Sequence, residues 1–219
     1  ALKSFRHKPK ILYPSIAATA LTAFQGWQGS VVVASQLEPI VVTVHMVLAL
    51  IIVSLLIYVT QEAYFSEREP GNLSQVLPKN TTVWFSVLWV LAIAQIILGT
   101  QIRSALELLR EEFPLMNSFE WLSKVGAINH IHMTLGVVLL AFTWYVGAST
   151  LKYKKQLPLL LKQSVIGMVL IASIQLILGM MFMLMEMTAL MQVFHLWMAS
   201  LYIGIVLLLF TISKRSQVE

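Results

Sequence analysis

The sequence predicts an all-α membrane protein, a polytopic helical bundle with six transmembrane helices. Of its 219 residues, 58% are hydrophobic and only 11% are charged, and the mean hydropathy is +0.80. Soluble proteins contain about 45–50% apolar and about 25% charged residues. A chain with so little charge cannot cover a water-facing surface. The composition therefore excludes an ordinary soluble enzyme, a disordered protein and a free nucleic-acid binder.

Each predicted helix is an apolar run long enough to cross a bilayer, which takes about 20 residues. Pro14, Pro39 and Pro158 lie near helix starts, where the missing N–H costs little. Very short links join the first helix to the second and the fifth to the sixth, and they predict tight hairpins. The runs are 11–34, 40–61, 82–102, 126–149, 158–185 and 189–213.

The connection at 103–125 differs from the short links because it is long and alternates acidic with apolar residues. One interpretation is an amphipathic helix that lies along the membrane interface. The alternative is a solvated loop.

The basic residues predict the orientation. Twelve of the 15 Lys and Arg residues lie on one side of the predicted membrane and three on the other. Positive charge collects on the cytoplasmic side, so both termini are expected there. The twelve are Lys3, Arg6, Lys8, Lys10, Arg68, Lys79, Lys152, Lys154, Lys155, Lys162, Lys214 and Arg215, and the three are Arg103, Arg110 and Lys124. The chain has no cysteine, which excludes disulfides and thiolate chemistry.

A Gln-x-x-x-Gly pattern indicates an internal repeat. It occurs in the first, third and fifth helices, as Gln25–Gly29, Gln95–Gly99 and Gln175–Gly179. His45 follows the first copy and His195 follows the fifth-helix copy at the same spacing. We therefore expect a parallel repeat of four-helix bundles, of which the first is incomplete. The Gln and Gly residues either serve helix packing only or line a cofactor cleft.

Three histidines form the strongest candidate site. His45, His132 and His195 lie roughly 9–10 Å along helices that start at the same face. Ionisable residues within a span usually face the bundle interior. His132 and His195 could ligate one haem iron from opposite sides, or each could be a hydrogen-bonded interior residue. His130 points away from His132 and is expected at the surface or in a supporting role, and His7 belongs to the solvated basic tail.

Other chemistry is sparse. Glu38 and Glu186 lie in short turns near the level of the histidines, where they either relay protons or face water. Arg103 and Lys124 lie where haem propionates would emerge, or they extend to the interface as ordinary basic residues. The eleven methionines are expected to pack or face lipid rather than ligate metal.

Several segments together resemble the haem A synthase family. The resemblance covers essentially the whole chain, and members of that family have two fused four-helix bundles with a His pair in each. This chain is similar to spans three to eight, and the two opening helices, with their His and outer-loop Glu, have no counterpart in it. The matching segments are Gln25-Gly26-Trp27-Gln28-Gly29, Leu37-Glu38-Pro39, Val42-Thr43-Val44-His45-Met46, Gln95-Ile96-Ile97-Leu98-Gly99-Thr100-Gln101 and Val193-Phe194-His195-Leu196.

The resemblance implies a division of the chain and roles for its residues. Residues 1–80 would be the second half of a substrate-haem bundle, with His45 as its catalytic iron ligand, and 81–219 a complete four-helix bundle. His132 and His195 would bind haem b there. Met133 follows His132, where members of the family often have Arg. Further cofactor contacts would come from Gln25, Gln95, Gln175 and Arg103.

The implied reaction is oxidation of a ring methyl of haem O, through a hydroxymethyl intermediate, to the formyl group of haem A for cytochrome oxidase. Side chains alone cannot perform this oxidation. The implied setting is a bacterial cytoplasmic membrane. Expected partners are lipid, a haem O-supplying enzyme and cytochrome oxidase assembly, with a homo-oligomer also considered and nucleic acid excluded.

Two other functions remain open from the residues alone. One is a bis-His cytochrome b subunit that transfers electrons to quinone within a larger complex. The other is a structural or assembly subunit without a cofactor. If the 219 residues contain only part of the substrate-haem bundle, we expect the chain to hold haem b without converting haem O.

Overall fold

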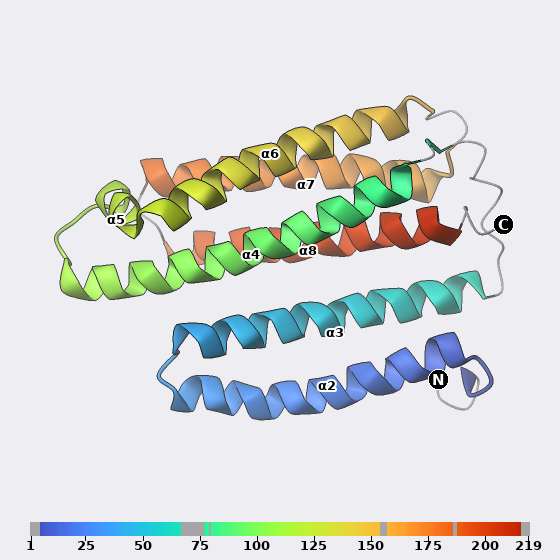
Figure 1. The fold of residues 1–219 in the computed structure, drawn as a ribbon, viewed down its shortest axis with the longest axis horizontal. Helices are drawn as coiled ribbons and strands as arrows, with labels where there is room; N and C mark the ends of the chain where they lie inside the picture. Colours follow the sequence, from blue (N-terminus) through green and yellow to red (C-terminus); the bar gives the residue numbers. More distant parts are fainter. Residues whose placement is uncertain (1–4, 67–76, 79, 154–156, 186–187, 216–219) are drawn as a thin grey trace.

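The computed structural model describes residues 5–66, 77–78, 80–153, 157–185 and 188–215. All regular structure in these residues is helical, as the composition predicts (Figure 1). The helices are α2 (Pro9–Ala34), α3 (Pro39–Phe65), α4 (Thr81–Glu112), α5 (Ser118–Val125), α6 (Ala127–Leu151), α7 (Leu159–Leu184) and α8 (Ala189–Arg215).

Five helices in the described residues are long and apolar enough to cross a membrane, namely α3, α4, α6, α7 and α8. The chain is therefore a multi-pass membrane protein. α2 has sufficient length, with 26 residues, but it is less apolar than these five because it carries Gln25, Gln28 and several small polar residues. It also begins earlier than expected, so Pro14 lies inside the helix.

α4 continues ten residues beyond the predicted end at 102. Charged residues begin there, so the apolar signal ends although the helix does not. The extension is rich in Leu, Glu and Arg, which are strong helix formers. Arg103 and Glu107 add an ion pair of 3.0 Å at the favourable spacing of four residues.

α4, α6, α7 and α8 form a four-helix bundle. α4 and α7 each contact both α6 and α8, whereas α6 and α8 occupy diagonal corners. Phe85, Leu88, Met168 and Val206 are completely buried in the centre of this bundle. The diagonal is bridged by one buried hydrogen bond of 2.6 Å, between the hydroxyls of Thr143 on α6 and Tyr202 on α8.

The hairpin of α2 and α3 packs beside this bundle through α3, which contacts α4 and α8. Its turn is a Schellman motif, in which Gln36 N–H donates to Val33 O and Leu37 N–H to Val32 O. Gln36 and Leu37 both have positive φ, at 53° and 65°. An ion pair between Glu62 and Arg215 joins α3 to α8 at the other end of the hairpin.

The short helix α5 covers the end of the bundle that lies opposite the last turn of α8 (Figure 1). Its Leu122 packs on Ile102 and Leu106 of α4. Gly126, with φ of +76°, allows the sharp turn into α6 that a side chain would strain. The prediction of a helix within 103–125 is confirmed, and the buried side of α5 faces protein. Its position relative to a lipid interface stays a prediction.

The described basic residues divide between the two ends of the bundle. Those near the termini are Arg6, Lys8, Lys10, Lys152, Lys162, Lys214 and Arg215, and those near α5 are Arg103, Arg110 and Lys124. Lys3, Arg68, Lys79, Lys154 and Lys155 lie outside the described residues. The charge division agrees with the expected orientation, which itself stays a prediction.

Candidate functional site

Each repeated glutamine holds a histidine on the neighbouring helix. In all three copies the side-chain amide Nε2 donates a hydrogen bond to the backbone carbonyl of that histidine. The sequence paired the first and fifth helices with their histidines, and the structure adds the third. The bonds are Gln25 to His45 at 2.9 Å, Gln95 to His132 at 3.0 Å and Gln175 to His195 at 2.8 Å.

The glycine of each copy lies under the ring of the same histidine. A Cβ atom added to Gly29 or Gly99 would lie 3.5 Å from Cε1 of His45 or His132. At Gly179 the corresponding distance to Cε1 of His195 is 3.9 Å. Each repeat is thus one unit of Gln, Gly and His, which we call the Gln-Gly-His module.

The register of the helices explains why the modules are equivalent. Gln25 and His45 are 20 residues apart, on either side of the α2–α3 turn, and Gln175 and His195 have the same separation. Gln95 and His132 are 37 residues apart because α5 is inserted between their helices, yet they make the same bond. Side chains equidistant from a hairpin turn meet across two antiparallel helices, and this register explains the equal separation of the first and third pairs.

His132 and His195 belong to the two diagonal helices of the bundle and lie five and six residues after the starts of α6 and α8. Both histidines are partly buried. The Nδ1 atoms of both rings are buried and have no hydrogen-bond partner among the described residues. His130 is exposed, in agreement with the prediction that it faces away.

His45 has a different environment. Its Nδ1 atom is hydrogen-bonded to Oε1 of Gln28, whose side chain is buried at 6% exposure. The Nε2 atom of the same Gln28 amide donates to the carbonyl of Val41 at 3.1 Å. Nearby, Thr43 accepts a hydrogen bond from Gln101 of α4 at 3.0 Å, which ties α3 to the bundle at the histidine level.

The remaining predicted residues lie at the same end of the molecule. Arg103 is exposed and paired with Glu107, and the Lys124 ammonium lies 4.3 Å from the ring centre of Phe113. Glu38 is exposed and immediately precedes α3. Glu186 lies outside the described residues. None of these contacts brings a carboxylate to a histidine ring.

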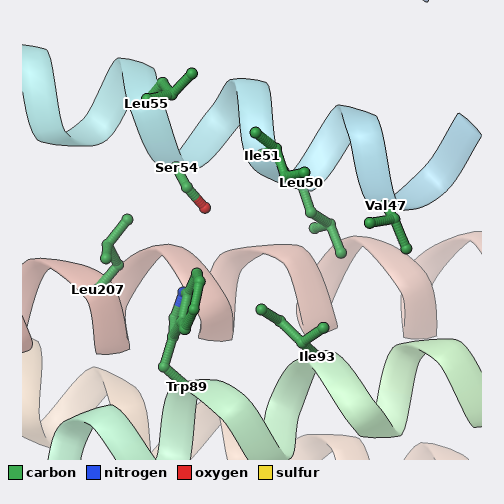
Figure 2. A pocket seen from close by; sticks show the side chains of 8 residues that line it. All are labelled: Val47, Leu50, Ile51, Ser54, Leu55, Trp89, Ile93 and Leu207. Atoms are coloured by element: carbon green, nitrogen blue, oxygen red, sulfur yellow. The ribbon is translucent and has the colours of Figure 1, made fainter. Parts of the chain in front are cut away.

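A shallow groove runs between α3, α4 and α8, starting two residues from His45 (Figure 2). Its volume is about 250 Å³, below the ~300–1,000 Å³ of typical ligand pockets. Apart from Ser54 and the indole N–H of Trp89, its lining is apolar and contains no metal ligand. The lining residues are Val47, Leu50, Ile51, Ser54, Leu55, Trp89, Ile93 and Leu207.

Three features of the site escaped the sequence reasoning. These are the Gln28 contact, the Thr143–Tyr202 bridge and the close approach at Gly136. A Cβ on Gly136 would lie only 2.9 Å from Nε2 of Gln95. Gly136 follows His132 by four residues, and small residues stand at the same place after the other two histidines: Ala49 and Ala199. That recurrence was the available signal.

Comparison with known proteins assigns the chain to a family. Residues 1–208 match the COX15-CtaA family model, described as cytochrome oxidase assembly protein. Searches of curated proteins and of solved structures give no match. The match covers nearly the whole chain, in agreement with the family resemblance of its motifs. This multi-pass protein therefore belongs to the COX15-CtaA family of cytochrome oxidase assembly proteins.

Proposed function

We propose that the chain is a haem A synthase-type oxidoreductase that oxidises a ring methyl of haem O to a formyl group. The observation that carries the proposal is the presence of two Gln-Gly-His modules in one bundle, with their histidines on the diagonal helices α6 and α8. Family membership supports a role in cytochrome oxidase assembly, the pathway that needs haem A.

The donor set of the four-helix bundle fits a haem. His132 and His195 contribute imidazoles from the helices at opposite corners of the bundle, each five or six residues from its helix start. No group of three or more His, Asp or Glu that could hold a bare metal ion occurs in the described residues. Two imidazoles would suffice to hold a haem iron, because the porphyrin would supply the other ligands. We assign haem b to this pair and the substrate haem to His45.

The protein's contribution is positional. Bound haem supplies the one-electron chemistry that side chains lack. Gln95 and Gln175 fix the backbone at His132 and His195, and the glycines leave room for the rings. Arg103 lies at the end of the bundle where it could exchange Glu107 for a propionate. We further propose a bacterial cytoplasmic membrane as the location, with both termini in the cytoplasm.

Haem content of single histidine variants tests the binding site. We expect His132→Ala and His195→Ala each to lose the b-type spectrum of the purified protein. His130→Ala is the matched control, because this histidine is exposed on the same helix and should keep the spectrum. Retention of haem by both His132→Ala and His195→Ala would refute the assignment of the pair.

Conversion of haem O separates the synthase from an electron-transfer subunit. Cells that make haem O and express the chain should accumulate haem A, measured by chromatography of extracted haems. A protein that binds haem b but yields no haem A would favour electron transfer, if the result is the same when any preceding residues of its natural chain are expressed with it. A colourless, folded protein would instead favour an assembly role without a cofactor.

A further inference from the structure

The three Gln-Gly-His modules differ in polarity at the residue just before the glycine. The residue just before the glycine is Gln28 in the first module, whereas it is Leu98 and Leu178 in the other two. Only the first module therefore has a polar side chain at this place. Its histidine, His45, has a hydrogen-bonded Nδ1, while the Nδ1 atoms of His132 and His195 have no partner in the described residues.

The second hydrogen bond of Gln28 fixes which end of its amide faces His45. The carbonyl of Val41 can only accept, so the amide group that contacts it must be the NH₂. The opposite end, Oε1, therefore faces the imidazole. Because Oε1 can only accept, the His45 ring must carry a proton on Nδ1 to make this bond. A neutral ring then has its lone pair on Nε2.

We propose that Gln28 is a positioning residue that holds His45 in the Nδ1–H tautomer and makes it a stronger electron donor than His132 or His195. When a ligating histidine donates a hydrogen bond from the ring nitrogen that does not bind the metal, that bond orients the ring and raises its basicity. The electron-donor part rests on the proposed role of His45 as a haem ligand. The tautomer part does not, because it concerns the ring in the protein without haem.

Nitrogen-15 NMR of the histidine rings tests the tautomer in haem-free full-length chain. The spectra are recorded at mildly alkaline pH, at which an ordinary free imidazole is neutral. The His45 signals, assigned with a His45→Gln variant, should show the proton on Nδ1. In Gln28→Leu, which copies the residue of the other modules, the ratio of Nδ1–H to Nε2–H should fall by roughly 3- to 17-fold, the range given by hydrogen bonds within membranes.

Two further variants keep the test decisive. Gln28→Glu preserves an acceptor and should keep the Nδ1–H form, which covers the case in which Gln28→Leu fails to fold. Gln25→Leu removes the bond to the His45 backbone but keeps the Gln28 amide, so it should change the ratio much less than Gln28→Leu does. An unchanged ratio in folded Gln28→Leu, or Nε2–H as the major form in the parent chain, would overturn the proposal.

The reciprocal change tests the electronic effect. Leu178→Gln places an acceptor beside His195, so the midpoint potential of the haem held by that histidine should fall, because a more basic ligand stabilises ferric iron. Gln28→Leu should raise the potential of haem bound at His45. A potential that does not move in either variant would refute the donor effect. If instead the NMR result holds but His45 binds no haem, the proposed function fails while the tautomer assignment stands.

Discussion

Replacing Gln95 by Leu should weaken haem binding much more than it weakens the fold. The lost bond from Nε2 of Gln95 to the His132 carbonyl is worth about 0.6 kcal/mol and at most about 1.7 kcal/mol within a membrane. The carbonyl also accepts the helical N–H four residues later, so it is not left bare. The substitution in addition removes Oε1 of Gln95, which is buried and has no hydrogen-bond partner among the described residues. These opposing effects should leave the free energy of unfolding within about 1 kcal/mol of the parent value.

Haem affinity should respond differently because Gln95 sets the position of His132. Supporting residues around a metal ligand typically contribute about 10- to 100-fold in affinity. Haem titration in detergent micelles measures this, with denaturant unfolding of the haem-free protein as the stability control. A haem affinity of Gln95→Leu within about twofold of the parent, together with a clear loss in the free energy of unfolding, would show that Gln95 serves helix packing only. That result would refute its role in positioning His132.

Five further substitutions have distinct expected outcomes. Gly136→Ala should reproduce Gln95→Leu, because its Cβ would lie 2.9 Å from Nε2 of Gln95 and displace the amide; normal haem titration would contradict this. Gly99→Ala should bind haem nearly normally, since its Cβ would make an ordinary 3.5 Å contact with the His132 ring. Gly99→Leu, whose larger side chain would occupy the place of that ring, should show no haem absorbance. Thr143→Val should lower the free energy of unfolding by about 1–3 kcal/mol, because it leaves the buried Tyr202 hydroxyl without its hydrogen-bond partner. Tyr202→Phe should lower it less, since Thr143 keeps its bond to the Leu139 carbonyl. Denaturant unfolding curves that give the reverse order would refute this interpretation.

Apolar runs and prolines predicted nearly all helix limits, because a bilayer demands long uninterrupted helices. They failed at α4, where the helix leaves the apolar region but continues through residues with high helix propensity. The repeat identified Gln25, Gln95 and Gln175 from spacing alone. It could not reveal that their amides bond backbone carbonyls rather than each other or a cofactor, since that depends on the register of two helices. The role of Gln28 was hidden for the opposite reason: it departs from the repeat.

The backbone target of the glutamines suggests why the module recurs. A hydrogen bond between two histidine rings, or between a histidine ring and a glutamine amide, would occupy the ring nitrogens that a ligand needs. A bond to the backbone carbonyl fixes the same helix while leaving the imidazole free. In α6 and α8 that freedom is complete, because Nδ1 of His132 and His195 has no partner in the described residues. In α3 the side-chain amide of Gln28 is hydrogen-bonded to Nδ1 of His45, which leaves Nε2 of that ring for a ligand. One packing solution thus provides two different hydrogen-bonding environments for an imidazole. We expect a single substitution at the residue before the glycine to convert one into the other.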